Sequence, residues 1–309
     1  MRSKEPLEDV ALAISAFRSD EQVVRLLGKT FEPGQPRFAA VIVVDSLGSG
    51  HIEETAKREG WPLRYINADR NLGSAGNLDL RLRTAADLGL EWCFALNHDG
   101  ALDQEKVGRL IEHGQSRPRI GAVYPQLIFT AAGHRPDSPR RRFHTYGLLE
   151  REARGDGKEC VEVVWSSSNG ALYRLDPVRE GMSGWPQLWM GYEDLAIGWE
   201  LKRRGWGQLL CRDVEVEDNY EFSPVRPLGR TIHLAAKPPW YNYYQERNLM
   251  LLARAKPGAP ISWAGALARF VIDLGLIIAI RDSKIERLRL SLRGFVDGLR
   301  GRTGKGPVP

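Results

Sequence analysis

The chain has 309 residues, of which 42% are hydrophobic and 27% are charged, and this composition excludes a disordered or fibrous protein. The formal net charge is +5, and all of it lies in residues 281–309, where eight basic residues stand against three acidic ones. Residues 1–280 are neutral overall, so the sequence does not predict a nucleic-acid partner.

The cysteines and the N-terminus favour a reducing, cytoplasmic location. Cys93, Cys160 and Cys211 are an odd and widely spaced set, which predicts neither a disulfide framework nor paired metal ligands. The N-terminal residues lack the apolar stretch of a secretory signal. The longest apolar run, 270–280, contains Asp273 and is shorter than the roughly 20 residues of a membrane span.

Strand and helix signals alternate over the first 130 residues. Strands are predicted at 10–15, 38–45, 63–67, 92–97 and 120–129, and helices at 20–27 (with Asp20 as its N-cap), 52–59, 74–88 and 103–114. This alternation predicts an α/β fold with a parallel, doubly wound sheet. Ligands of such sheets bind beyond the carboxyl ends of the strands, where Asp45 and Asn97 fall.

The second half is less regular and then becomes helical. Residues 130–157 are rich in Arg and Pro and predict a long loop or hairpin, of a length that is typical of segments covering a site. Helices are predicted at 193–204, 240–255, 261–280 and 284–299. We place a loose boundary between an α/β domain of residues 1–256 and a helical, basic tail of residues 257–309.

The turn after the second strand, VIVVDSLGSGHIEE, contains Gly48 and Gly50. A dinucleotide-binding loop would have a third glycine where this chain has Glu53, so the pattern indicates such a loop only weakly. Asp45 offers another interpretation, because a carboxylate at a strand end accepts hydrogen bonds from a nucleobase or from ribose hydroxyls.

A second polar cluster, Asn97–His98–Asp99–Gly100, follows the strand 92–97. A carboxylate at a strand tip suits Mg²⁺, which takes one or two carboxylates together with phosphate oxygens. Equally, this acid is in position to cap the helix that begins near Asp103. The sequence leaves both interpretations open.

A third cluster, Glu193 and Asp194, begins a predicted helix. Acidic residues stabilise a helix N-terminus, and one of them is equally suited to act as a general base. Trp185 and Trp189 precede them in a loop with Gly and Pro, where their aromatic faces suit a sugar ring. The aromatic run 238–244 is explained at least as well by helix packing.

Eight segments, taken in chain order, together form a pattern that is more specific than any one of them. They are ALAISAFRSDEQVVRLL, VIVVDSLGSG, NADRNLGSAGNLDLRLRTA, ALNHDGALD, SSSNGALYRLD, LWMGYEDLAIGWELKRRGW, YNYYQERNLMLLAR and LRGFVDGLRGRTGK. They are spread over nearly the whole chain, and together they resemble the family-2 inverting glycosyltransferases of GT-A fold, especially the rhamnosyltransferase-like branch. The resemblance implies a Rossmann-like, mostly parallel sheet flanked by helices, with a helical C-terminal extension.

The resemblance also implies a reaction. The sugar of a UDP- or dTDP-sugar, with rhamnose as the first guess, would pass to a hydroxyl of a glycan or lipid-linked acceptor with the help of Mn²⁺ or Mg²⁺. Asp194 matches the catalytic base, with Glu193 beside it, and Asp99 matches the metal-ligating acid. Trp185 and Trp189 are the acceptor-side candidates. The donor site implied by the resemblance comprises Phe17, Asp45, Asn71, Gly73 and the segment up to Asn77, and Asn97.

Two departures from the family pattern bear on the metal. Asn97 stands where the family has an acid, which predicts weaker metal binding. The family also has a His after the strand that follows Arg-Gly-Trp; by spacing that position is Asp218, and His233 lies 15 residues later. Both are candidate third ligands. A non-catalytic nucleotide-sugar-binding protein of the same fold is the alternative function.

The basic tail has an apolar stripe at helical spacing, formed by Ile285, Leu288, Leu292, Phe295, Val296 and Leu299, beside Arg289, Arg293 and Arg300. Such a helix either lies on an anionic bilayer or packs its stripe on the protein body. Lipid-linked acceptors in the resembled family favour peripheral attachment at the inner face of the plasma membrane.

Overall fold

The protein is described here by a computed structural model. It describes residues 7–100, 103–130, 133, 135–136, 140–143, 149–151, 157–218, 222–225, 232–255 and 258–306. The predicted domain boundary at residues 256 and 257 lies outside these described residues.

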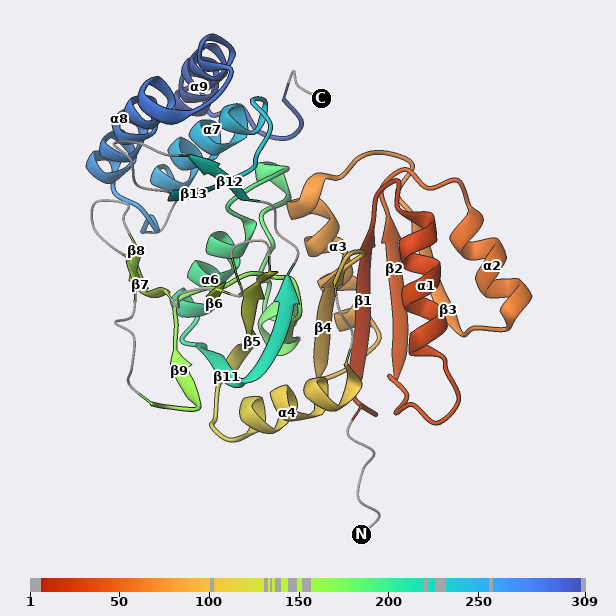
Figure 1. Cartoon of the computed structure of the whole chain (residues 1–309). Helices are drawn as coiled ribbons and strands as arrows, with labels where there is room; N and C mark the ends of the chain where they lie inside the picture. Colours follow the sequence, from red (N-terminus) through yellow and green to blue (C-terminus); the bar gives the residue numbers. More distant parts are fainter. Residues whose placement is uncertain are drawn as a thin grey trace.

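The core of the molecule is a mixed sheet of nine strands in the order β3-β2-β1-β4-β10-β5-β11-β9, with β6 paired to β5 (Figure 1). Its strands are β1 (Val10–Ala16), β2 (Ala40–Asp45), β3 (Leu63–Asn67), β4 (Trp92–Asn97), β5 (Ile120–Phe129), β6 (Arg135–Pro136), β9 (Cys160–Glu162), β10 (Ala171–Arg174) and β11 (Gly207–Asp218). Strands β1 to β4 are parallel, as predicted. Strand β10 inserts antiparallel between β4 and β5.

Helices cover both faces of the sheet. On one face α1 (Asp20–Thr30), α2 (His51–Glu59) and α4 (Gln104–Gln115) bury residues such as Leu27, Ile52 and Leu110. On the other face α3 (Gly73–Asp87) and α6 (Glu193–Arg203) bury residues such as Leu82 and Leu201, and α5 (Asp176–Arg179) lies at the end of β10. Continuous apolar strands such as β2 fit this position, because both of their faces are buried.

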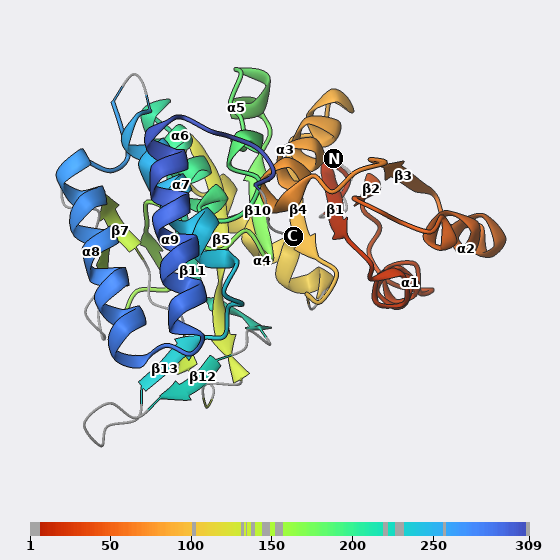
Figure 2. The same ribbon diagram turned by 90° about the horizontal axis from the view of Figure 1, so that it is seen from above.

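The C-terminal helices α7 (Tyr241–Ala253), α8 (Trp263–Ile280) and α9 (Lys284–Leu299) form a group at one side of the sheet (Figures 1 and 2). Helix α9 packs closely on α7, since a Cβ on Gly294 would lie 2.2 Å from the Tyr243 carbonyl oxygen. The rings of Phe270 and Phe295 stack between α8 and α9 at 4.2 Å. The chain then returns to the body, where the Gly304 amide donates to the carbonyl of Gln187.

Two predictions about connections are refined by the structure. Ser19 occupies the N-cap position of α1 without a side-chain capping hydrogen bond, and Asp20 lies in the first turn of the helix. Within residues 130–157 the described parts include a hairpin, β7 (Arg140–Phe143) with β8 (Leu149–Arg151), and the rest lies outside the described residues. A second hairpin pairs β12 (Phe222–Val225) with β13 (Ile232–Ala235).

The prediction that the cysteines do not pair is wrong for two of them. Cys160 and Cys211 form a disulfide, while Cys93 is free and buried. The reason is topological: β9 returns antiparallel to β11 and brings the two cysteines opposite each other, although 51 residues separate them in sequence.

The prediction that the apolar run 270–280 is too short to span a membrane is also wrong, because the helix that contains it is long and apolar enough by length and composition. Helix α8 has 18 residues and a mean hydropathy of 1.9, and only 28% of it is buried. Asp273 does not interrupt its outer surface, because the side chain is buried, 2.9 Å from Arg269 and 2.8 Å from Gln245.

Candidate active site

The candidate site includes the carboxyl ends of β1, β2 and β4. Because these strands are parallel, their ends lie side by side at one edge of the sheet. Ser15 is opposite Asn97, and Ala16 is opposite Asp45. The Ser15 hydroxyl donates to Asn97 Oδ1 at 3.2 Å, which ties the two strand ends together. Phe17 follows directly and is exposed.

Asp45 is fully buried beneath the turn that follows β2. One carboxylate oxygen accepts from the Leu47 amide at 3.2 Å and the other from the Tyr65 hydroxyl at 2.9 Å. Burial and this hydrogen bond raise the pKa of Tyr65, so the hydroxyl stays a donor. Gly48 passes so close to the carboxylate that a Cβ there would lie 1.7 Å from Asp45 Oδ2. Asp45 therefore fixes the shape of this turn.

The segment before and within α3 supports the same turn. The Asn77 amide donates to the Val44 carbonyl at 2.9 Å and to the Ser46 hydroxyl at 3.2 Å. Asn71 Oδ1 accepts from the amide of Gly73, which has φ 66° and admits no side chain against the Trp189 carbonyl.

Asp99 is exposed just beyond β4, and it does not cap α4. Asp103 is the N-cap, since its carboxylate accepts from the amides of Glu105 and Lys106. The structure thus excludes the capping interpretation of Asp99, while its role as a metal ligand stays a prediction. Its chemistry fits Mg²⁺ or Mn²⁺, which prefer oxygen ligands.

The loop between β9 and β10 connects this strand end to α6. The Asn97 amide donates to Asn169 Oδ1 at 3.1 Å, and the neighbouring Ser168 amide donates to Asp194 Oδ1 at 3.1 Å. The neighbouring residues Ser168 and Asn169 therefore link the Asp194 carboxylate to Asn97, which lies two residues before Asp99. Beside it, Glu193 Oε2 is buried and accepts no hydrogen bond among the described residues.

A buried cation lies behind these acids. Arg81 of α3 donates to the carbonyls of Ala13 and Leu96, on β1 and β4, at 2.9 and 3.0 Å. Burial lowers its pKa to about 10, and the carboxylates of Asp194 and Glu193 act in the opposite direction. Arg81 is thus charged at neutral pH and offsets part of the negative charge of the site.

The loop that leads into α6 is strained and firmly held. Trp185, Trp189 and Tyr192 have positive φ values of 55°, 60° and 66°, which non-glycine residues rarely adopt. Asn248 of α7 donates to the carbonyls of Leu188, Met190 and Gly191 in this loop, at 2.7 to 3.0 Å.

The predicted ring-stacking role of Trp189 does not agree with its packing. The side chain is 4% exposed, its ring stacks on Tyr244 at 4.7 Å, and its indole donates to the Asn71 carbonyl. Trp189 therefore joins the segment that contains Asn71 to α7 from within the protein. Trp185 is half-buried and its indole donates to Glu200 at 3.2 Å.

The two candidate third metal ligands lie away from Asp99, Asp218 in the main sheet and His233 in the separate β12–β13 hairpin. Asp218 ends β11, which is separated from β4 by β10 and β5, or about 14 Å at ordinary strand spacing. His233 lies in β13, opposite Pro224, and its side chain is outside the described residues.

The chain is similar to known proteins both in part of its sequence and in its fold. No protein-family model matches the sequence. The chain is 28% identical over 143 residues to galactofuranosyltransferase GlfT1 of Mycolicibacterium smegmatis, which covers 45% of this chain and 47% of the relative. It is 25% identical over 165 residues to GlfT1 of Mycobacterium tuberculosis, covering 53% and 54%. The chain therefore spans about half the length of the curated relatives it matches.

Solved structures extend the comparison to nearly the whole chain. S. aureus TarS in complex with UDP-GlcNAc superposes with a TM-score of 0.56 at 13% identity, covering 95% of this chain and 81% of that one. The mannosyltransferase PcManGT of Pyrobaculum calidifontis, solved with GDP-Man and Mn²⁺, has a TM-score of 0.54 at 14% identity, covering 95% and 88%. The chain has the GT-A fold.

Four residues that hold the candidate site in place were assigned no role from the sequence. They are Arg81, Asn169, Arg247 and Asn248. Arg247 and Asn248 lie in the segment YNYYQERN. From the sequence alone, its aromatic side chains are suited either to stack on a sugar ring or to pack into the protein body. The structure shows packing: Tyr243 and Tyr244 are buried. Arg247 donates to the carbonyls of Leu188 and Gly304 at 2.6 and 2.5 Å. The signal in the sequence is that Arg247 and Asn248 directly precede the apolar run 249–253 of the same helix.

Proposed function

We propose that the protein is an inverting glycosyltransferase, which moves a sugar from a nucleotide-activated donor to a hydroxyl group of a glycan or lipid-linked acceptor. One observation carries the proposal. The Ser168–Asn169 turn contacts the Asp194 carboxylate on one side and the end of β4, next to Asp99, on the other. A potential general base and a potential metal ligand thus share one short turn on a GT-A fold.

The proposed chemistry is a single displacement. Asp194 accepts the proton of the acceptor hydroxyl as its oxygen attacks the anomeric carbon, and the nucleoside diphosphate leaves from the opposite face, which inverts the configuration. Asp99, with phosphate oxygens of the donor, would hold Mn²⁺ or Mg²⁺, which offsets the charge of the leaving diphosphate when bound. Glu193 adds negative charge beside the base, and Arg81 limits the resulting repulsion.

The donor is proposed to be a UDP- or dTDP-sugar. Phe17, which is exposed, is the candidate for direct contact with the base, while Asp45 and Asn77 hold the turn against which the nucleotide would lie. The names of the relatives favour a galactofuranosyl group as the first to test, with the rhamnosyl group of the sequence-based expectation second. Asn71, Gly73 and Asn97 complete the proposed donor site.

The acceptor side is proposed to lie near the strained loop 185–192, with Trp185 as the remaining aromatic candidate because Trp189 is buried. Asp218 and His233 stay candidates for an additional metal ligand, to be brought to Asp99 by donor binding.

We also propose that the C-terminal helices bind an anionic membrane surface peripherally, where a lipid-linked acceptor would reside. Helix α9 buries Leu290, Gly294 and Gly298 against the body, and of the predicted apolar stripe only Leu288 and Phe295 are half-buried. The outer apolar side chains of α8 and α9 are exposed at Trp263, Leu267, Val271, Ile272, Leu276, Ile278, Ile285, Leu292, Val296 and Leu299. Lys284, Arg289, Arg293 and Arg300 are exposed on α9 and suit acidic headgroups.

The Asp194→Asn variant tests the catalytic proposal. We expect transfer from UDP-galactofuranose or dTDP-rhamnose to fall by about 10²- to 10⁴-fold, as for the loss of a general base, while UDP or dTDP still stabilises the protein thermally. Asp99→Asn should instead abolish the extra stabilisation that Mn²⁺ adds to the nucleotide.

Three outcomes contradict the proposal. Transfer retained by Asp194→Asn removes the assigned base, and a nucleotide response that is independent of Mn²⁺ in the wild type removes the metal. Nucleotide binding without transfer or hydrolysis of any donor in a panel of nucleotide sugars supports the non-catalytic binding protein instead.

A further inference from the structure

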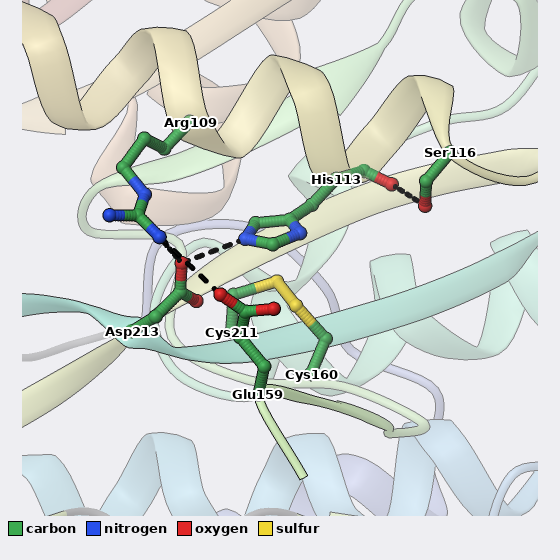
Figure 3. Close-up of a disulfide and its surroundings, with 7 residues drawn as sticks. All are labelled: Arg109, His113, Ser116, Glu159, Cys160, Cys211 and Asp213. Carbon is green, nitrogen blue, oxygen red and sulfur yellow. Dashed lines mark hydrogen bonds and ion pairs between the residues drawn. A yellow bond between two sulfur atoms is a disulfide. The ribbon is translucent and has the colours of Figure 1, made fainter.

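A cluster of potential metal ligands lies away from the carboxyl ends of β1, β2 and β4, between the edge of the sheet and α4 (Figure 3). Cys160 of β9 is opposite Cys211 of β11, and Asp213 follows two residues later on β11. His113 extends from the last turn of α4 toward Asp213. The potential ligand atoms of these four residues all lie within 4.8 Å of one another.

We propose that, when Cys160 and Cys211 are reduced, these four residues bind a divalent ion of the zinc class. Two thiolates, an imidazole and a carboxylate are ligands that Zn²⁺ takes in a tetrahedral arrangement, with ligand atoms about 3 to 4 Å apart. The site therefore differs in kind from the oxygen-ligand site at Asp99, because thiolates select Zn²⁺ over Mg²⁺ and Mn²⁺.

Hydrogen bonding around Asp213 supports the assignment. Asp213 Oδ2 accepts from Arg109 at 2.6 Å and contacts His113 Nε2 at 2.9 Å. Asp213 Oδ1 is buried and has no hydrogen-bond partner among the described residues. A buried carboxylate oxygen without a partner is costly, and a metal ion would satisfy it.

The charges agree with a bound ion. Two thiolates and one carboxylate around a divalent cation leave one net negative charge, and the Arg109 guanidinium beside Asp213 offsets it. Arg109 would also hold the carboxylate in place from outside the ligand set, as residues around metal sites commonly do. Solvent reaches the cluster through a surface pocket lined by His113, Ser116, Arg117 and Cys160.

The disulfide and the metal are alternative states of the same cysteine pair. A dithiol passes two hydrogen atoms to the Cys160–Cys211 disulfide, which gives two protein thiols and the cyclic disulfide of the reagent. Metal binding then displaces the two thiol protons into the buffer. Either state joins β9 to β11, but the metal also attaches α4 through His113.

The test uses the full chain, reduced with a dithiol and freed of the reagent without oxygen. Zn²⁺ is titrated against a chromogenic chelator, and Co²⁺ is added separately as a spectroscopic probe. We expect one Zn²⁺ per chain and a thiolate-to-cobalt charge-transfer band for the wild type and for Cys93→Ala. This control removes the free buried cysteine outside the cluster.

The ligand variants separate a four-ligand site from simple thiol binding. His113→Gln and Asp213→Asn keep both cysteines, and each should weaken Zn²⁺ binding by on the order of 10-fold or more. Cys160→Ser and Cys211→Ser should lose the cobalt band. Unchanged affinity in both His113→Gln and Asp213→Asn, or equal Zn²⁺ binding by the oxidised wild type, would overturn the proposal.

Discussion

At the scale of single residues, the protein keeps several ionisable side chains in buried positions. Glu246 of α7 is fully buried, and neither of its carboxylate oxygens has a hydrogen-bond partner among the described residues. Burial, and then the nearby Asp273 carboxylate, raise its pKa to about 9, against the opposing effect of Arg269. Glu246 is therefore protonated at neutral pH.

This raised pKa predicts a pH-dependent stability. Between the unfolded value near 4.5 and the folded value of about 9, the folded chain holds a proton that the unfolded chain has lost. The free energy of unfolding should then fall by up to about 1.4 kcal/mol for each pH unit in this window. Glu246→Gln removes this contribution, so urea denaturation from pH 5 to 8 should give a flatter profile. An identical pH dependence in the two proteins would contradict the assignment.

Gly48 offers a second test at the residue scale. In Gly48→Ala the new methyl group would overlap the Asp45 carboxylate and the Tyr65 hydroxyl, so the turn must move. We expect a loss of about 1 to 3 kcal/mol in stability and weaker nucleotide binding, measured by denaturation and by thermal shift with UDP. Gly28→Ala is the control, since its Cβ would make only ordinary contacts 3.9 Å from Trp61. Equal behaviour of both variants would show that the close approach at Gly48 is unimportant.

At the scale of elements, α9 is attached to α7 through small residues. A Cβ on Gly298 would lie 2.6 Å from the Arg247 carbonyl oxygen, and Gly294 makes a similar approach to Tyr243. The adjoining Tyr243 hydroxyl donates to Asp297 at 2.9 Å. Because α9 meets α7 through these residues, four side chains of its apolar stripe, Ile285, Leu292, Val296 and Leu299, are exposed, while Phe295 packs on Phe270 of α8.

Alanine at Gly294 should therefore separate the two helices. Because backbone atoms of α7 cannot move aside as a side chain would, we expect Gly294→Ala to cost at least about 1 to 3 kcal/mol of unfolding free energy. Gly275→Ala on α8 has nothing within 4 Å of its Cβ, and should be neutral or stabilising by about 0.5 to 1 kcal/mol. Calorimetric unfolding of the two variants measures the difference, and a neutral Gly294→Ala would contradict the packing argument.

At the scale of the whole molecule, the positive charge and the exposed apolar side chains are both found at the C-terminal helices. The helices α8 and α9 lie side by side at the outer edge of the molecule (Figures 1 and 2). Deleting residues 281–309 would uncover α7, so point substitutions on the exposed stripes are the better probe of membrane binding.

Flotation with vesicles tests this surface. Val271 and Ile285 are 65% and 86% exposed, so Val271→Asp with Ile285→Glu should leave the fold intact and abolish flotation with anionic vesicles. Leu88→Glu is the control, because Leu88 is 39% exposed at the end of α3 on the body. Flotation of the wild type should weaken at high salt, since the basic residues act through screened charge. Undiminished flotation of the double variant would refute the membrane proposal.

The parallel half of the fold could be predicted closely from the sequence. Strands β4 and β5 and helix α9 have the predicted bounds, because apolar runs, helical spacing and caps act over a few residues. Strand β10 and its antiparallel insertion could not be foreseen in the same way, since pairing between β4 and β5 joins segments far apart in the chain.

By itself, then, the sequence determined which residues end the parallel strands, Asp45 and Asn97 among them, and that a pair of acids begins α6. Those features follow from local patterns. Only the tertiary structure decided that Asp103 caps α4 while Asp99 stays exposed, that Trp189 is buried, and that most of the apolar stripe of α9 is exposed. It also decided that two distant cysteines meet beside His113 and Asp213. The physical reason is that burial and contact depend on which surfaces pack together, and local sequence does not carry that information.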